Sequence, residues 1–297
     1  MLKYKIILEK SKEGRQENVK KAIIIPNYLK ENSISFSQVA KELLAKHGYA
    51  VQVLNENEAP DEDAEFALVL GGDGTLLRAC KKLYFLDIPM LGINYGNLGY
   101  LTGCNPENAL EAIEKIVIGN FTIEKRAMLS GQVVRNGESV YSFVALNECA
   151  FYRASFLKAF TMEIYINGVY THSVVGDGLI VATPTGSTSY NMSVGGPVLT
   201  PNADNMVITP VSPIYFPKSS LVANGSDSVD IGIKVNSITK IGTPSLQIDG
   251  DVAFELQNGD VVKIRKHEKC ARIIKVSDRS FYQVLSHKLS KATLDNA

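Results

Sequence analysis

Four Asn-Gly pairs between residues 136 and 259 constrain the fold of this chain more than any other feature of the sequence. The pairs fall at 136–137, 167–168, 224–225 and 258–259, and strand-like segments such as 161–166 and 261–265 flank them. Both residues of such a pair tolerate the positive φ angles of a type I′ turn, so Asn-Gly is a strong hairpin signal. Repeated hairpins place neighbouring strands antiparallel, and we therefore expect a predominantly antiparallel β domain over residues 120–277.

The first 119 residues have a different pattern, in which apolar strand-like runs alternate with helical segments. Strands are predicted at 22–25, 49–54, 66–70 and 89–94, and helices at 37–46, 75–84 and 106–118. Such alternation indicates a parallel sheet with helices on both faces, so we predict a Rossmann-like α/β domain over residues 1–119. Ligands of these sheets bind at the carboxyl ends of the strands, where Asp73 and Asn94 fall. The pattern becomes helical again from residue 278, and residues 289–297 are expected to form a loose tail.

A glycine-rich segment, which we call the glycine turn (71–75), follows the predicted strand at 66–70 and reads Gly-Gly-Asp-Gly-Thr. Glycines such as Gly72 and Gly74 allow positive φ and expose backbone N–H groups, which suits a phosphate. Asp73 is the single carboxylate of the turn. It is placed to receive a hydroxyl proton or to position a metal ion in phosphoryl transfer. An ordinary Asp-Gly turn is the alternative.

A second candidate for phosphate binding is the hydroxyl-rich turn (183–189), Thr-Pro-Thr-Gly-Ser-Thr-Ser, which follows a short apolar run at 179–182. The run is expected to be a buried strand, and Thr188 or Ser189 is placed to cap a short helix that begins near Tyr190. Hydroxyls and free N–H groups at a helix start form a neutral anion site. Tyr190 either stacks on a base or is a core tyrosine.

An amide and a carboxylate stand together at Asn147 and Glu148, directly after the apolar run at 143–146. The amide offers a donor and an acceptor, and an ionised carboxylate accepts from two hydroxyls, so the pair suits a sugar. A plain turn at a strand end is the alternative. Asp177, between two glycines, is a further acidic candidate, and an Asp-Gly turn is again the alternative.

The composition is that of an ordinary soluble enzyme, and it argues against two classes of partner. Thirty-one basic residues balance thirty-one acidic ones among 297, so no global charge recruits nucleic acid or an anionic membrane. No apolar run approaches the roughly 20 residues of a membrane span, and the first residues carry no signal-peptide pattern. The four cysteines and four histidines are scattered without metal-ligand spacing. This favours free thiols in a reducing cytoplasm and gives little support for structural zinc.

Taken together, these segments resemble the NAD kinases, which use ATP to phosphorylate the 2′-hydroxyl of the adenosine ribose of NAD. Four blocks carry the resemblance in the family's order, namely the glycine turn, residues 92–102, residues 146–148 and residues 176–190. Residues 249–251, Asp-Gly-Asp, form a weaker fifth block, and the likeness covers roughly residues 20–280. The first block is also similar to lipid kinases and, more loosely, to phosphofructokinases, whereas the third and fourth blocks together are far more specific.

The resemblance implies that Asp73 accepts the hydroxyl proton and takes part in ordering Mg²⁺ or another divalent cation. It implies that Asn147 and Glu148 hold the ribose and base of NAD, and that Asp177 binds the nicotinamide half. Lys158 matches a position that is often basic and near the nucleotide. The full set of implied nucleotide-binding residues is Gly72, Gly74, Thr75, Asn94, Tyr100, Asn147, Glu148, Lys158, Asp177, Thr185, Ser187, Thr188, Ser189, Tyr190, Asn191, Ser193 and Asp251.

Tyr100 matches a family position that is usually aromatic and lines the adenine pocket, or it is a packing residue. Four positions depart from the family pattern. They are Asn97 for a common arginine, Val175 for a basic or polar residue, Ser189 for a frequent alanine, and Asp251 where glutamine often follows Asp-Gly. None touches the implied chemistry, but donor preference, feedback by NADPH and sharing of the site between subunits depend on such positions.

The resemblance further implies ATP as the phosphoryl donor, a homodimer or homotetramer, and a C-terminal segment, 278–297, that packs back on the first domain. Two other functions stay open. A lipid kinase with the same glycine turn would need a surface for membrane docking, and no basic amphipathic helix is evident. A non-catalytic NAD-binding sensor would be expected to have lost Asp73, which is present.

Overall fold

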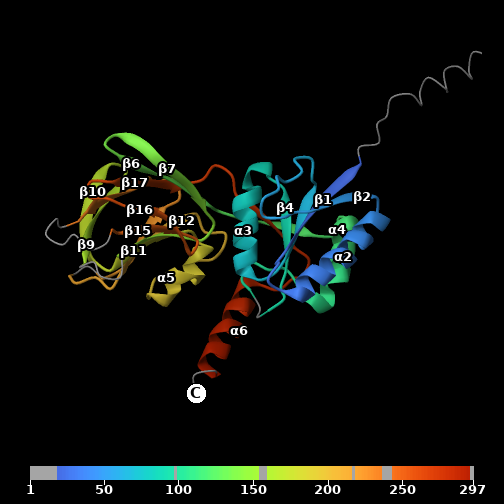
Figure 1. Ribbon diagram of the computed structural model, residues 1–297. Coiled ribbons are helices and arrows are strands. Elements are labelled where there is room, and N and C mark those ends of the chain that lie inside the picture. Colours follow the sequence, from blue (N-terminus) through green and yellow to red (C-terminus); the bar gives the residue numbers. More distant parts are fainter. Residues whose placement is uncertain (1–18, 97–98, 154–158, 216–217, 236–242, 295–297) are drawn as a thin grey trace, which may run out of the picture.

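The computed structural model describes residues 19–96, 99–153, 159–215, 218–235 and 243–294, which form two lobes (Figure 1). The first lobe is built on a mixed six-stranded sheet with helices on both faces, and the second on two six-stranded antiparallel sheets. This arrangement confirms the predicted α/β domain followed by an antiparallel β domain. Helix α3 stands between the lobes, and helix α6 projects from their junction (Figure 1).

The sheet of the first lobe has the strand order β2-β1-β3-β4-β18-β5. Its strands are β1 (Lys20–Pro26), β2 (Tyr49–Val53), β3 (Phe66–Leu70), β4 (Pro89–Ile93), β5 (Thr122–Arg126) and β18 (Ala271–Lys275). β1 to β4 are parallel, as the alternation predicted, and β18 runs parallel to β4. β5 pairs antiparallel with β18 at the edge. The sheet therefore includes two strands from the range 120–277, one at each end of the segment that we expected to form the second domain.

Helices cover both faces of this sheet and bury its apolar strands. They are α2 (Glu31–Lys46), α3 (Asp73–Leu83) and α4 (Ala109–Val117), and α6 (Phe281–Leu294) follows the last strand. α2 and α4 pack on one face through residues such as Leu44 and Ile113. α3 packs on the other face, where Leu76 lies in one apolar cluster with Leu146 from the second half of the chain. α6 continues to Leu294, so the expectation of a loose tail from residue 289 was wrong for residues 289–294.

The second lobe consists of two sheets packed face to face. One has the order β10-β9-β14-β17-β6-β7 and the other β13-β12-β11-β8-β15-β16. The strands of the first are β6 (Leu129–Arg135), β7 (Glu138–Ala145), β9 (Phe160–Ile166), β10 (Val169–Gly176), β14 (Val229–Lys234) and β17 (Val261–Lys266). Those of the second are β8 (Glu148–Tyr152), β11 (Gly178–Ala182), β12 (Asn205–Val211), β13 (Leu221–Asn224), β15 (Ser245–Ile248) and β16 (Asp251–Glu255). Phe151, Phe160 and Ile231 belong to the shared core, and the short helix α5 (Tyr190–Ser193) packs outside it.

The Asn-Gly pairs divide into two groups in the structure. Those at 136–137 and 167–168 have positive φ at both residues and close the β6–β7 and β9–β10 hairpins, as predicted. The pairs at 224–225 and 258–259 connect strands that belong to different sheets, so the hairpins expected there were wrong. A hairpin that the sequence reading missed is β15–β16, where Asp249 and Gly250 have φ angles of 49° and 88°.

Candidate active site

Asp73 is the first residue of α3 and follows Gly72, the residue that caps the helix after β3. Its Oδ2 accepts a hydrogen bond of 2.8 Å from the backbone N–H of Tyr100, and its Oδ1 accepts one of 3.1 Å from Leu101. The side chain is nevertheless 28% exposed. The carboxylate is thus fixed in orientation by the backbone of a neighbouring loop and still open to a ligand.

Two glycines near Asp73, Gly71 and Gly99, are needed for close approach rather than for the backbone freedom that we expected. None of the glycines of the glycine turn has a positive φ, so that part of the prediction was wrong. A Cβ atom on Gly71 would lie 2.3 Å from Oγ1 of Thr75, and one on Gly99 would lie 2.0 Å from Oδ1 of Asp73. Only glycine leaves room at either position for the side chain that packs on it.

Thr75 and Asn94 are buried close to Asp73 and support the shape of the site. Oγ1 of Thr75 accepts a hydrogen bond of 3.3 Å from the side chain of Asn27, and Oδ1 of Asn94 accepts one of 3.0 Å from Gly96. Gly74, by contrast, has open space where a Cβ atom would point. A ligand that approaches the start of α3 would therefore meet Gly74 and Asp73 before the buried Thr75.

Tyr100 packs against α6 beside Asp73. Its ring centroid lies 6.3 Å from that of Phe281 and 4.1 Å from Nζ of Lys288. Burial raises the pKa of Tyr100, and its hydroxyl has no hydrogen-bond partner among the described residues. The C-terminal helix therefore contacts the first lobe at the position where the resemblance places an adenine-binding aromatic.

Arg126, the last residue of β5, is a buried cation that the sequence reading did not single out. Its guanidinium donates to Glu124 at 3.1 Å, to the carbonyl of Tyr100 at 3.5 Å, and to Oγ1 of Thr185 at 3.4 Å. The backbone of Tyr100 holds Asp73, and Thr185 belongs to the hydroxyl-rich turn. Arg126 therefore links the two predicted phosphate-binding segments across the lobes.

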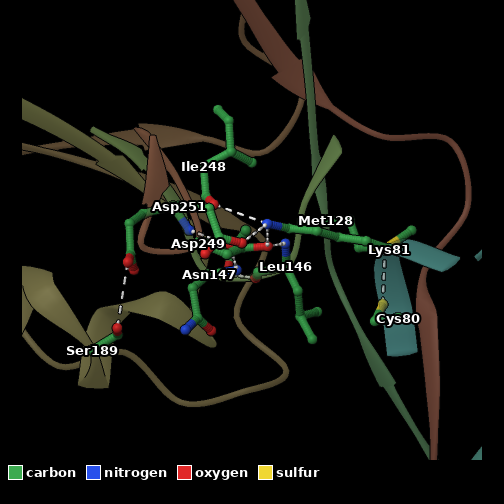
Figure 2. A network of polar contacts seen from close by, with 11 residues as sticks. Cys80, Lys81, Met128, Leu146, Asn147, Ser189, Ile248, Asp249 and Asp251 are labelled. Carbon is green, nitrogen blue, oxygen red and sulfur yellow. Dashed lines mark hydrogen bonds and ion pairs between the residues drawn. The ribbon is translucent and has the colours of Figure 1, made fainter. Parts of the chain in front are cut away.

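Asn147 and Glu148 lie where the chain passes from β7 to β8, and the carboxylate of Asp249 fixes them there (Figure 2). Its Oδ1 accepts hydrogen bonds from the backbone N–H groups of Asn147 at 2.7 Å and Glu148 at 3.1 Å. Its Oδ2 accepts one from Leu146 at 3.1 Å. Three consecutive N–H groups thus share one buried acceptor, which defines the backbone of the predicted sugar-binding pair.

Lys81 of α3 joins this network from the first lobe (Figure 2). Its Nζ donates to the carbonyl of Ile248 at 2.8 Å and lies 3.7 Å from Oδ2 of Asp249 and 3.4 Å from Oδ2 of Asp251. Asp251 is 72% exposed, and the contact with Lys81 is therefore an ion pair at the protein surface. Since α3 begins at Asp73, the same helix carries the candidate catalytic carboxylate and, about 12 Å further along, Lys81. Lys81 contacts the carboxylate that holds the backbone of Asn147 and Glu148.

Glu148 is a buried carboxyl group, and one of its oxygens is free to form a further hydrogen bond with a ligand. Its Oε1 accepts a hydrogen bond of 3.4 Å from Ser189, and its Oε2 has no partner among the described residues. Burial, and secondly the negative charge of Asp249, raises the pKa of Glu148 to about 8. A ligand hydroxyl that donated to Glu148 would satisfy the free oxygen and favour the ionised form.

Several residues of the hydroxyl-rich turn use their polar atoms within the protein. The hydroxyl of Ser187 donates to the carbonyl of Pro184 at 2.6 Å and accepts from Leu199 at 2.9 Å. The amide of Asn191 donates to the carbonyl of Ser187 at 3.1 Å, and Thr188 donates to a neighbouring carbonyl at 3.2 Å. These side chains stabilise the turn, and the structure therefore gives them no free group for phosphate.

Ser189 precedes α5 at the predicted capping position, but its side chain makes no capping hydrogen bond there. Its hydroxyl donates to Glu148 instead, so this detail of the prediction was wrong. Gly186 brings the turn close to the pair, because a Cβ atom on it would lie 2.1 Å from the carbonyl oxygen of Asn147. Ser193 is exposed at the end of α5.

Tyr190 and Asp177 have partners within the protein. Tyr190 stacks on Tyr152 with ring centroids 5.9 Å apart, and the two hydroxyls are hydrogen-bonded to each other. Asp177 forms an ion pair of 2.9 Å with Nε of Arg153. Lys158 lies outside the described residues. The structure thus joins Asp73, Thr185, Asn147, Glu148 and Ser189 through shared contacts, whereas Asp177 and Ser193 take no part in that set.

The fold and the site define a two-lobed protein with a candidate catalytic carboxylate at the start of the helix between its lobes. The profile of the ATP-NAD kinase N-terminal domain matches residues 30–121, and that of the ATP-NAD kinase C-terminal domain matches residues 146–276. The NAD kinase of Natranaerobius thermophilus is 33% identical, with 90% of this chain and 96% of that protein covered. The NAD kinase of Lachnoclostridium phytofermentans is 34% identical, with 91% and 99% covered. The chain belongs to the NAD kinase family and is an enzyme of that class.

Two solved structures share the architecture. A yeast NADH kinase complexed with NADH superimposes with a TM-score of 0.80 at 19% identity, and covers 93% of this chain and 89% of its own. An NAD kinase from Archaeoglobus fulgidus in complex with ATP gives a TM-score of 0.73 at 25% identity, with 91% and 98% covered. The match extends across both lobes, so it confirms the two-domain fold.

Proposed function

We propose that this NAD kinase transfers the γ-phosphate of ATP to the 2′-hydroxyl of the adenosine ribose of NAD, with Asp73 as proton acceptor. Asn147 and Glu148 hold the ribose, because one oxygen of Glu148 has no hydrogen-bond partner among the described residues and lies beside an amide. Asp73 approaches the 2′-hydroxyl with a carboxylate that two backbone N–H groups orient. Phosphoryl transfer requires mainly positioning and charge neutralisation, and both are built into this arrangement.

The observation that carries the proposal is that two cations, Arg126 and Lys81, each connect the part of the site around Asp73 with the part around Asn147 and the hydroxyl-rich turn. Arg126 contacts the loop that holds Asp73 and also Thr185 of the hydroxyl-rich turn. Lys81, on the same helix as Asp73, lies beside the carboxylate that fixes Asn147. Two independent sets of polar contacts therefore fix Asn147 relative to Asp73, which supports their proposed roles in holding the sugar and accepting its proton.

A divalent cation fits this site as an ion held by one carboxylate together with the substrate phosphates. The described residues hold no group of three or more His, Cys, Asp or Glu side chains suited to a metal ion. Mg²⁺ commonly uses one or two carboxylates together with substrate phosphates and waters, and Asp73 is the carboxylate placed for this. When bound, the ion would neutralise charge on the phosphates.

The test is to incubate the purified protein with NAD, ATP and Mg²⁺ and to detect NADP with an NADP-specific dehydrogenase. Such a dehydrogenase responds to the 2′-phosphate, so the assay checks the position of transfer as well as its occurrence. We expect NADP to accumulate in proportion to enzyme. NAD consumption without a dehydrogenase signal would contradict the proposed acceptor hydroxyl.

We also propose a cytoplasmic location, which the four free cysteines support because thiols persist in reducing compartments. The structure has no helix long and apolar enough to cross a membrane within its described residues. A homodimer or homotetramer is proposed from the family resemblance. Light scattering coupled to size exclusion tests it directly, and a monomer at micromolar concentration would contradict it.

A further inference from the structure

Lys288 of α6 reaches the candidate catalytic carboxylate from the far end of the chain. Its Nζ lies 3.9 Å from Oδ2 of Asp73 and 4.1 Å above the ring of Tyr100. The side chain is 31% exposed, so it is partly buried. The charged end is thus held between an aromatic face and a carboxylate, and the exposed part of the side chain leaves it accessible to a ligand.

Two other cations lie near Asp73, but a carboxylate already engages both. Arg126 and Lys275 pair with Glu124 at 3.1 Å and 3.4 Å. Arg126 is in addition bound to a backbone carbonyl and to the hydroxyl-rich turn. Among the described cations near Asp73, Lys288 has the longest ion pair with a carboxylate, at 3.9 Å. Its flexible stem allows the ammonium group to move to another partner.

The start of α3 offers backbone N–H groups but no cationic side chain, and several hydroxyls of the hydroxyl-rich turn already donate within the protein. A transferred phosphoryl group carries charge on three oxygens, which cations stabilise in phosphotransferases. A pocket beside Tyr100 is lined by Lys115, Lys275 and Arg279 and by one acid, Glu111, which pairs with Lys115 at 2.9 Å, so its lining carries a net positive charge. The described cations near Asp73 therefore come from β5, β18 and α6, and Glu124 engages the first two, which leaves Lys288 of α6 as the candidate for a polyphosphate.

We propose that Lys288 is a catalytic residue that contacts the transferring phosphate of ATP, an assignment that rests on the proposed kinase function. Without nucleotide it pairs with Asp73 and covers Tyr100. When the triphosphate binds, the ammonium group donates to phosphate oxygens and leaves Asp73 free to accept the hydroxyl proton. The C-terminal helix thereby becomes part of the active site.

Binding of ATP and AMP by titration calorimetry, without NAD, tests this contact independently of turnover. Lys288→Met removes the charge and keeps the length, Lys288→Arg restores a cation, and Lys41→Met is the matched control on the exposed face of α2. We expect Lys288→Met to weaken ATP binding about tenfold, as the loss of a hydrogen bond from a charged group does. AMP, which lacks the outer phosphates, should bind Lys288→Met and wild type alike. Lys288→Arg should recover most of the ATP affinity.

The turnover of the same variants separates phosphate contact from helix packing. We expect kcat for NADP formation to fall about a hundredfold in Lys288→Met, with KM for NAD unchanged. Equal loss of ATP and AMP binding would show that Lys288 only supports the structure and would overturn the proposal, as would unchanged ATP binding. If wild type binds ATP but makes no NADP, the proposed function fails while the binding comparison still decides the role of Lys288.

Discussion

The carboxylate of Asp249 accepts a 2.7 Å hydrogen bond from the backbone N–H of Asn147, across a sequence separation that spans most of the second lobe. Asp249 adopts a left-handed backbone with φ of 49°, a conformation that Asp tolerates better than most residues. The β15–β16 turn thus places the carboxylate of Asp249 beside the backbone N–H groups of the β7–β8 connection. Residue choice at a hairpin therefore fixes the geometry of the proposed sugar-binding pair far along the chain.

Replacing Asp249 with Ala should destabilise the protein and weaken NAD binding. Three buried N–H groups would lose their acceptor, and Lys81 would lose a partner, so we expect a loss of about 3 kcal/mol in the free energy of unfolding. Urea unfolding measures this loss. Asp249→Asn is the matched variant, because it keeps one acceptor oxygen and tolerates the left-handed backbone, and it should lose less. Equal stability of Asp249→Ala and wild type would contradict the assigned role.

A methyl group at Gly99 should damage catalysis by displacing Asp73. The added Cβ atom would lie 2.0 Å from Oδ1 of Asp73, so the carboxylate must move. A displacement of about 1 Å can cost a hundredfold in rate, and we expect kcat to fall by about that factor. Gly232→Ala is the control, because its Cβ atom meets nothing closer than 3.5 Å. Wild-type turnover in Gly99→Ala would show that Asp73 tolerates repositioning.

The stability of the protein should depend on pH through Glu148. Its pKa of about 8 in the folded state exceeds the ordinary 4.5, so the folded protein binds a proton that the unfolded chain releases. The resulting stabilisation is complete below about pH 4.5 and is lost as the pH rises through about 8. Relative to Glu148→Gln, wild type should lose up to about 1.4 kcal/mol per pH unit within this window. Urea unfolding of both proteins at several pH values measures the difference, and parallel pH profiles would contradict the raised pKa.

NAD binding should release a proton near neutral pH. A ribose hydroxyl that donates to Glu148 favours the ionised carboxylate, so binding lowers a pKa that starts at about 8. The affinity should therefore increase from pH 6 to 8 and level off above about 8. Calorimetry at pH 7 in buffers of different ionisation enthalpy measures the proton directly. A binding enthalpy independent of the buffer would mean that Glu148 does not change protonation.

Local patterns predicted most of the fold because the relevant signals lie close together in sequence. The strand, glycine turn and helix around Asp73 follow directly from apolar runs and breakers. The addition of β5 and β18 to the first sheet could not be predicted in this way, because it depends on pairing between segments far apart in the chain. The Asp249-Gly250 hairpin did carry a turn signal, which we used only as a family motif.

Candidate site residues could be proposed from the sequence where they sit in a motif, and not where their part depends on a distant partner. Asp73, Asn147 and Glu148 stand in recognisable segments. Lys81 and Lys288 are single lysines on helices, and in the sequence alone such residues are indistinguishable from ordinary surface charge. Their positions matter only because folding brings them to Asp249 and Asp73.

The role of Asp73 is tested by comparing NADP formation by wild type and Asp73→Asn, with NAD binding measured on the same samples by calorimetry. We expect Asp73→Asn to fold, to bind NAD as wild type does, and to turn over about a hundred- to ten-thousand-fold more slowly. That result would place the proton acceptor at the start of α3. Turnover at the wild-type rate would contradict the central claim, since the carboxylate would then have no part in the reaction.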